Sequence, residues 1–255
     1  MSNLTSAALR LSVIVPAWHD YENLAHLLPS LVRLDGLDEV IVADASPCAA
    51  AAELAQQTGA NYLAAPQPNR GAQMNLGAGK ATGNVLIFHH SDSVLTQEHV
   101  CAIRDALRQP TVIGGAFYRK FDARHPRLLW LESVARFLTR NGGSFFGDQS
   151  VFVRRDTFLQ LGGFASIPLM EDMEFSRRLR RAGTVAVLDP PLQSSTRRHA
   201  DRGAWRTSIQ NGLFIVLYKC GFSPAHLHRW YYRERRALSN NSLLVPQAVE
   251  ELSRR

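Results

Sequence analysis

Cysteine and long apolar runs are scarce in this sequence. Its 255 residues include three cysteines, Cys48, Cys101 and Cys220, which lack the paired spacing of a disulfide framework or a zinc knuckle. No run reaches the roughly 18 apolar residues expected of a membrane-spanning helix. Residues 1 to 9 also lack the charged start and the long apolar stretch of a signal peptide. These absences predict a cytoplasmic protein whose thiols stay reduced.

The charge of the chain is uneven along its length. Residues 1 to 196 contain 18 Lys+Arg and 18 Asp+Glu, whereas residues 197 to 255 contain 11 and 4, so the net charge of +7 comes from the last 59 positions. Such an excess indicates an anionic partner. Nucleic acid is not expected, because the sequence has no helix-turn-helix, zinc-finger or aromatic RNA-binding signature. An anionic small molecule explains the excess at least as well.

Hydrophobic residues make up 45% of the chain and charged residues 20%, as in soluble globular proteins. Strand-like runs alternate with helical patterns, which predicts βαβ units in one mostly parallel, Rossmann-like α/β sheet. We expect one domain over residues 10 to 220 and a helical extension over 221 to 255. Strands are predicted at 11–16, 39–43, 61–64, 85–89, 113–119, 150–154 and 184–188, and helices at 22–34, 49–58, 71–80, 97–107, 126–139, 155–161 and 172–182. Pro190 and Pro191 should end the last strand, since neither can donate to a ladder.

Polar residues follow several of these strands. The first strand stops at Pro16, the second at Asp44, and the strand at 85–89 stops beside Asp92. Because ligands of open α/β sheets bind at the carboxyl ends of the strands, these groups should face one crevice.

The order of these segments resembles the family 2 glycosyltransferases, which have the GT-A fold. The likeness covers roughly residues 11 to 220 and is greatest to a bacterial subgroup linked with selenosugar and arsenosugar biosynthesis. The residues that carry it are LSVIVPAWHDYENL, EVIVADASP, IFHHSDS, NRGAQMNLGAGKATG, GGAFYRKF, FFGDQSVFVRR, GGFASIPLMEDMEFSRRLRR and SSTRRHADRG.

The resemblance implies a binding site for a nucleotide-sugar donor. In the first βα turn the family has Asn-Glu where this chain has His19-Asp20. Asp20 keeps a carboxylate for ribose hydroxyls, although it could instead cap the helix at 22. Asp44 would accept the imide N–H of uracil, or be a turn residue with Ser46 capping the next helix. The implied donor-binding residues are Pro16, Ala17, Trp18, Asp20, Asp44, Arg70, Asn75, Ser91, Arg197 and Arg198.

The arginines of this set suit phosphate. Arg70 can contact phosphate oxygens in a bidentate way, while Gly71 allows the backbone to come close. Arg197 and Arg198 lie where the family closes a loop over the diphosphate, and they could stabilise the departing UDP. Solvation at the surface is the alternative for each of them.

The family's Asp-X-Asp signature corresponds to His90-Ser91-Asp92. The signature brings a divalent cation to the diphosphate, so the resemblance implies Mg²⁺ or Mn²⁺ with Asp92 and His90 as ligands. Because His90 replaces the first carboxylate, the expectation of a metal is weaker than the full signature would make it. Asp92 could also cap the helix at 97.

Four further residues are implied in catalysis: Asp148, Gln149, Glu171 and Asp172. In inverting members an acidic residue near the start of the helix at 172 is the general base that deprotonates the acceptor. Helix capping is the alternative role of Asp172, and the two roles are compatible.

The resemblance thus implies an inverting, UDP-sugar-dependent transferase. Its subgroup points to a selenosugar synthase that joins UDP-GlcNAc or UDP-glucose to selenophosphate. An arsenic compound, a sugar hydroxyl or a polyprenyl phosphate remains open as acceptor, and so does a regulatory protein that binds nucleotide without turnover. The aromatic and basic segment 205 to 233 should pack on the core or on a twin subunit rather than lie on a membrane. A homodimer therefore remains open.

Overall fold

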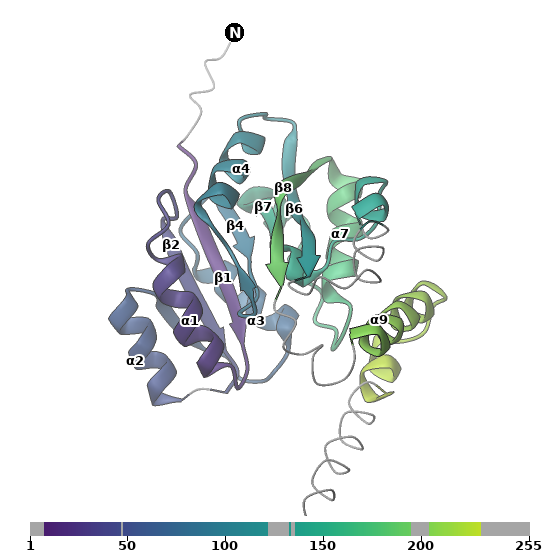
Figure 1. Ribbon diagram of the computed structural model, residues 1–255, viewed down its shortest axis with the longest axis horizontal. Coiled ribbons are helices and arrows are strands. Elements are labelled where there is room, and N and C mark those ends of the chain that lie inside the picture. Colours follow the sequence, from purple (N-terminus) through teal and green to yellow (C-terminus); the bar gives the residue numbers. More distant parts are fainter. Residues whose placement is uncertain (1–7, 47, 122–132, 134–135, 195–203, 231–255) are drawn as a thin grey trace, which may run out of the picture.

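The computed structural model describes residues 8–46, 48–121, 133, 136–194 and 204–230. Their centre is an eight-stranded sheet with the order β3-β2-β1-β4-β7-β6-β8-β5 (Figure 1). The predicted α/β fold with a mostly parallel sheet is confirmed. The strands are β1 (Leu11–Ala17), β2 (Glu39–Asp44), β3 (Asn61–Ala64), β4 (Val85–Phe88), β5 (Ser93–Val94), β6 (Val112–Phe121), β7 (Val151–Arg154) and β8 (Thr184–Ser194).

Helices cover both faces of the sheet. Alternate residues of a strand face opposite sides, so Val13 and Val15 of β1 pack with α1, α2 and α4, whereas Ile14 packs with α3, α6 and α7. In Figure 1, α1 and α2 lie in front of the sheet and α3 lies behind it. The helices are α1 (Tyr21–Leu31), α2 (Ala49–Thr58), α3 (Arg70–Lys80), α4 (Gln97–Leu107), α6 (Arg155–Gln160), α7 (Glu171–Ala182) and α9 (Ala204–Lys219), with a 3₁₀ turn η1 (Gly147–Gln149).

Strands β1 to β4 pair in parallel, so their carboxyl ends meet at one edge of the sheet. Strand β7 lies antiparallel between β4 and β6 and reverses the chain direction there. The start of β7 therefore reaches the edge where β4 ends, and the turn η1 that precedes it lies beside the residues that follow β4.

The prediction that Pro190 and Pro191 end a strand is wrong, because β8 continues to Ser194. The register of β8 against β6 explains this. Leu188 pairs with Phe117 and Leu192 pairs with Arg119, so the register shifts across the two prolines. Proline lacks an N–H donor, and an irregularity of this kind lets it stay in a strand.

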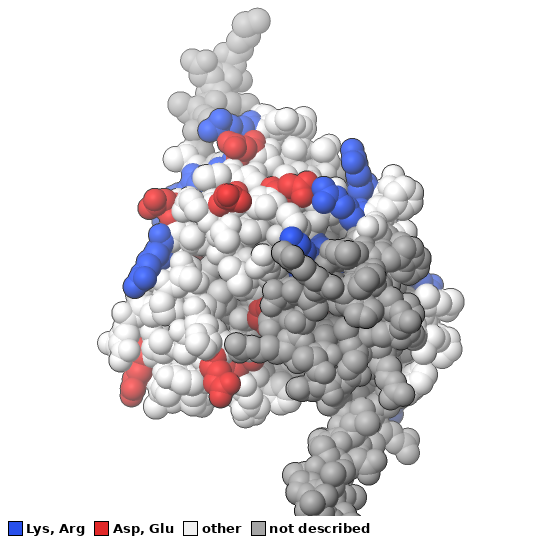
Figure 2. Space-filling model, in the orientation of Figure 1, with Lys and Arg blue, Asp and Glu red and all other residues white. Residues whose placement is uncertain are grey.

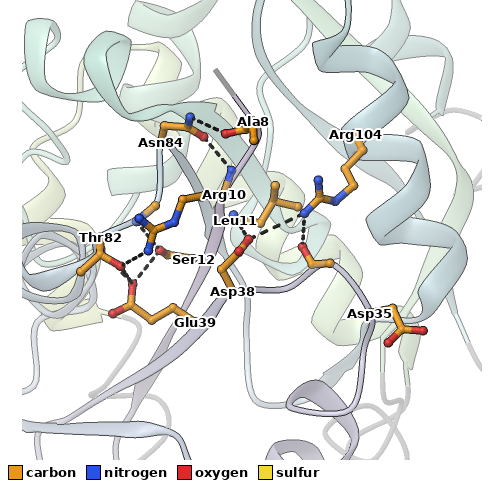
Figure 3. A network of polar contacts seen from close by, with 12 residues as sticks. Ala8, Arg10, Leu11, Ser12, Asp35, Asp38, Glu39, Thr82, Asn84 and Arg104 are labelled. Atoms are coloured by element: carbon orange, nitrogen blue, oxygen red, sulfur yellow. Dashed lines mark hydrogen bonds and ion pairs between the residues drawn. The ribbon is translucent and has the colours of Figure 1, made fainter. Parts of the chain in front are cut away.

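A polar network connects the amino ends of β1 and β2, opposite to the carboxyl ends of these strands (Figure 3). Glu39 accepts hydrogen bonds from the Ser12 hydroxyl at 2.7 Å and from the Thr82 amide at 2.9 Å. The Asp38 carboxylate accepts from the Leu11 amide at 2.8 Å. These contacts fix the starts of β1 and β2 and leave their carboxyl ends open for a ligand.

The remaining expectations concern membrane spans, cysteines, surface charge and the C-terminal part of the chain. Within the described residues, no helix has both the length and the apolar character needed to cross a bilayer. The three cysteines are exposed and form no disulfide. On the face shown in Figure 2, basic side chains lie in the upper part beside acidic ones, and acidic side chains lie at the lower edge. Most of the predicted helix at 126–139 and much of the basic segment 197–255 lie outside the described residues.

Candidate active site at the carboxyl edge of the sheet

The loop after β1 is joined to the loop after β4. Asp20 precedes α1, but its side chain makes no capping hydrogen bond to the helix. Its Oδ2 instead accepts a hydrogen bond from the Ser91 hydroxyl at 2.6 Å, and its Oδ1 accepts one from Asn23 at 2.8 Å. The predicted residues Asp20 and Ser91 are therefore brought together. Trp18, in the same loop, is 46% exposed, so its ring is available to a ligand.

The carboxylate of Asp44 lies at the end of β2, beside Ala17 at the end of β1. Its Oδ1 accepts from the amide and the hydroxyl of Ser46, at 2.8 and 2.9 Å, and its Oδ2 accepts from the Tyr62 hydroxyl at 3.1 Å. Burial and the Asp44 charge raise the pKa of Tyr62 to about 12, so this hydroxyl remains a donor. Ser46 does not cap α2, whose N-cap is Cys48.

Gln73 is a site-building residue that the sequence reasoning missed. Its side chain, on α3, is 4% exposed and donates to the carbonyl oxygens of Ala17 at 2.6 Å and Ala43 at 2.8 Å. It thereby bridges the carboxyl ends of β1 and β2. The available signal in the sequence was a glutamine among the glycine and alanine residues of the helical segment RGAQMNLGAG.

The N-terminus of α3 meets the N-terminus of α7. The guanidinium of Arg70 lies 3.4 Å from Oε1 of Glu171, with 46% of the Arg70 side chain exposed and 3% of Glu171. A Cβ on Gly71 would lie 2.7 Å from the Ala165 carbonyl oxygen and 3.5 Å from Cβ of Glu171. Gly71 therefore permits close approach of the segment before α7, and Arg70 lies at this junction with about half of its side chain exposed.

Asn75, which is predicted to contact the donor, is hydrogen-bonded to the loop before α7. Its amide donates to the Phe164 carbonyl and accepts from the Phe164 amide, both at 2.8 Å. Both ends of the side chain are therefore engaged by one backbone unit. Asn75 thereby fixes α3 to the loop before α7.

Residues 90 to 92 pack against the turn η1. A Cβ on Gly147 would lie 2.3 Å from Nε2 of His90, so glycine is needed for this contact. That nitrogen is buried against Gly147, and His90, a predicted metal ligand, also borders the recess described below.

The carboxylate of Asp172 lies on the other side of Gly147. Its Oδ2 accepts from the Gly147 amide at 2.8 Å and its Oδ1 accepts from the Met173 amide at 2.7 Å. Burial, and then the neighbouring Glu171 charge, raise the pKa of Asp172 to about 7, against the opposing effects of Arg70 and the two amides. A carboxyl with a pKa near neutrality can accept a proton during a reaction at physiological pH.

The two residues after Gly147 have different surroundings. Asp148 forms an ion pair with Arg119 of β6 at 2.7 Å, and both side chains are partly exposed. Gln149 is 4% exposed; it donates to the Phe117 carbonyl at 2.9 Å and accepts from the Phe146 amide at 2.8 Å. Both ends of its side-chain amide are hydrogen-bonded to backbone groups. Gln149, which is predicted to act in catalysis, therefore holds the turn η1 against β6.

Six residues enclose a polar recess of about 50 Å³, and all of them belong to the predicted segments: Pro16, Asp20, Arg70, His90, Ser91 and Asp92. This volume suits an ion or a water molecule rather than a whole nucleotide. No group of three His, Cys, Asp or Glu side chains that could hold a metal occurs among the described residues. A divalent cation beside Asp92 would thus need phosphate oxygens or water to complete its ligands. The predicted Arg197 and Arg198 lie outside the described residues.

Comparison with protein families supports the resemblance. The family model described as glycosyl transferase family 2 matches residues 12–162, which include the ends of β1, β2 and β4 and the turn η1. No curated protein matches the chain significantly.

Three solved structures illustrate the shared fold. A mannosyltransferase, PcManGT from Pyrobaculum calidifontis, in complex with GDP-Man and Mn²⁺, is 18% identical with a TM-score of 0.63, over 86% of this chain and 67% of that one. S. aureus TarS 1–349 in complex with UDP-GlcNAc is 18% identical with a TM-score of 0.59, over 74% and 59%. Glucosyl-3-phosphoglycerate synthase from Mycobacterium tuberculosis, in complex with Mn²⁺, UDP and glucosyl-3-phosphoglycerate, is 18% identical with a TM-score of 0.58, over 85% of this chain and 81% of that one.

Proposed function

The chain belongs to glycosyl transferase family 2, and on this premise we propose that it transfers a hexose or N-acetylhexosamine from a UDP-sugar to an anionic acceptor, with inversion at the anomeric carbon. The observation that carries the proposal is the convergence of Asp20, Arg70 and Asp92 on one polar recess, next to the Asp172 carboxylate. The groups that would bind the donor and the carboxylate that would activate the acceptor then lie near one another at the carboxyl edge of the sheet.

The donor would occupy the edge formed by β1, β2 and β4. Trp18 and Asp44 would flank the base. Asp20 would accept hydrogen bonds from the ribose hydroxyls in place of the one that it accepts from the Ser91 hydroxyl. Arg70 is half-exposed and borders the recess, so its guanidinium can pair with the diphosphate. Mn²⁺ or Mg²⁺ arriving with the donor would be held by Asp92 and would neutralise charge that develops on the leaving UDP. TarS and glucosyl-3-phosphoglycerate synthase, which share the fold, have structures with UDP-GlcNAc and with UDP.

The acceptor would approach from the side of η1 and α7. Its nucleophilic atom attacks C1 of the donor sugar opposite the diphosphate, the C1–O bond breaks, and the electron pair leaves with UDP. A hydroxyl acceptor loses its proton to the Asp172 carboxylate in the same step. Placement of the two substrates and stabilisation of the leaving charge would supply most of the rate enhancement.

Selenophosphate is the acceptor that we propose, and this part rests on the sequence alone, namely its resemblance and its charge distribution. Its selenium is already a strong nucleophile, so it needs little general-base assistance. After selenium displaces UDP from C1, hydrolysis of the Se–P bond by water releases phosphate and a selenol sugar. The basic excess of residues 197 to 255 would suit two anionic substrates.

Product analysis tests both levels of the proposal. Purified protein is incubated anaerobically with UDP-glucose or UDP-GlcNAc, MnCl₂ and freshly made selenophosphate, and the products are identified by mass spectrometry. We expect UDP together with a selenium-containing sugar. Parallel reactions offer a sugar hydroxyl, an arsenic compound or a polyprenyl phosphate; transfer to one of these alone would overturn the selenophosphate acceptor and keep the transferase. UDP binding without transfer to any acceptor would indicate the nucleotide-binding regulatory protein.

A further inference from the structure

One buried histidine, His89, connects the two loops that carry the candidate site. It follows β4 directly, has no exposed surface, and lies next to residues 90–92, here called the phosphate loop. Its Nδ1 is 2.6 Å from the hydroxyl of Ser150, and its Nε2 is 3.0 Å from the carbonyl oxygen of Ser93. Its backbone amide donates to the Ile14 carbonyl at 2.9 Å, so it is anchored to β1 as well.

The partners of His89 fix its tautomer. The Ser93 carbonyl can only accept, so Nε2 carries the proton, and Nδ1 accepts from the Ser150 hydroxyl. A neutral ring satisfies both contacts.

Each partner ends one of the two loops. The Ser93 amide donates to the His90 carbonyl at 3.2 Å, so the bond from His89 to Ser93 closes the phosphate loop on itself. Ser150 ends η1 with a left-handed φ of 47° and is fully buried. A non-glycine residue in this region is strained, and it keeps this conformation only where its surroundings hold it. The hydrogen bond to His89 is such a restraint.

We propose that His89 is a positioning residue that holds the phosphate loop and the turn η1 in one fixed relation. This inference rests on the proposed function, because it assigns the two loops to donor and acceptor. His89 itself touches no substrate. Its effect reaches the reaction through Gly147, which contacts His90 on one side and donates to Asp172 on the other.

The first test reads the ring directly. Nitrogen-15 NMR of the uniformly labelled protein at pH 7.5 should show one histidine, absent from His89→Gln, that is protonated at Nε2 and not at Nδ1. A His89 signal that carries its proton on Nδ1 would overturn the proposal whatever the activity.

The second test measures turnover at saturating UDP-sugar, with the acceptor established by product analysis. His89→Asn keeps an acceptor near Nδ1, His89→Gln keeps a donor near Nε2, and Ser150→Ala removes the hydroxyl. Each should lower kcat by about 10-fold to 100-fold, as the loss of outer-shell support does elsewhere. His89→Gln combined with Ser150→Ala should cost less than the product of the single losses, since both remove the same link.

Ser12→Ala is the matched control, because Ser12 is equally buried and donates to Glu39 at the opposite edge of the sheet (Figure 3). It should lower the melting temperature as Ser150→Ala does and leave kcat unchanged. Equal kcat values for Ser150→Ala and Ser12→Ala, in an active wild-type background, would overturn the positioning role. A wild-type protein that neither binds UDP nor turns over would instead remove the proposed function, while the NMR result would still decide the state of His89.

Discussion

The carboxylate of Asp172 accepts a hydrogen bond from the backbone amide of Gly147, with 2.8 Å between Oδ2 and the nitrogen. The same glycine has no room for a Cβ, because that atom would lie 2.3 Å from Nε2 of His90. Gly147 therefore separates the loop assigned to the diphosphate from the carboxylate assigned to the acceptor, and it contacts both.

Gly147→Ala should displace His90 and disturb the hydrogen bond to Asp172. We expect kcat to fall by about 10-fold to 100-fold with the fold intact, because a misplacement of about 1 Å in a site can cost this much. Gly79→Ala on α3 is the control, since nothing lies within 4 Å of its added Cβ. Circular dichroism checks folding. Unchanged turnover in folded Gly147→Ala would show that the contact between the two loops has no role in the reaction.

Asp172→Asn should separate the two kinds of acceptor. With a hydroxyl acceptor, loss of the base should lower kcat by about 10²-fold to 10⁴-fold, whereas selenophosphate should retain appreciable activity. With a hydroxyl acceptor, wild-type kcat/KM should rise with pH through about 7, the raised pKa of Asp172, because the carboxylate must be ionised to take a proton. A pH profile that stays flat through this range, or a fully active Asn variant with a hydroxyl, would remove Asp172 as the base.

The same raised pKa predicts how stability depends on pH. Because the pKa of Asp172 is higher in the folded than in the unfolded state, its protonated form favours folding. That contribution is present below the usual pKa of 3.8 and is lost as pH rises through about 7. The wild-type free energy of unfolding should therefore fall between these values relative to Asp172→Asn. Denaturant melts of both proteins at pH 4.5 and 7.5 measure the difference; parallel values would contradict the raised pKa.

Arg70→Ala should weaken donor binding by about 10-fold or more, since hydrogen bonds to charged groups are worth about 1.5 to 3 kcal/mol. It should also leave Glu171, which is buried, without its ion pair. Arg108→Ala is the control, because that side chain is 80% exposed on the surface. Calorimetric titration with UDP gives both affinities. Equal dissociation constants for the two variants would place Arg70 outside the donor site.

Asp44 should favour uridine nucleotides. Its carboxylate accepts hydrogen bonds and so suits the imide N–H of uracil but not the ring nitrogen of cytosine. UDP should bind more tightly than CDP or GDP, and Asp44→Asn should reduce the preference. Ser46 and Tyr62 now occupy both oxygens, so Tyr62→Phe should not weaken UDP binding. Equal or tighter binding of GDP to the wild type would exclude Asp44 from base recognition.

Much of the fold could be predicted from the sequence, because the spacing of hydrophobic residues and the residues that end helices and strands are local features. The strands β1 and β2 and the helices α2, α3 and α4 begin and end within a residue or two of their predicted bounds. The continuation of β8 through Pro190 and Pro191 could not be read in this way. It depends on a register shift against β6, which is a property of the pairing and not of either segment.

The site was predictable to the level of segments and less so to the level of contacts. Asp20, Arg70 and Asp92 converge because parallel strands end at one edge. Asn75 was assigned to the donor from its motif, yet its partner is Phe164, 89 residues away. His89 was missed because its role depends on Ser150, 61 residues away. Contacts between residues so far apart in the sequence are set by the tertiary fold, so local sequence patterns do not predict them.

The measurement that tests the account most directly is the binding of UDP to wild type and to Asp92→Ala, by calorimetry with MnCl₂ present. Asp105→Ala is the control, since Asp105 is an exposed carboxylate on α4. If the recess beside Asp92 receives the diphosphate, UDP should bind wild type and Asp105→Ala alike, and Asp92→Ala should bind it at least about 10-fold more weakly, a difference of about 1.4 kcal/mol. Absence of UDP binding to the wild type, or equal affinity in all three proteins, would contradict a donor site at this edge of the sheet.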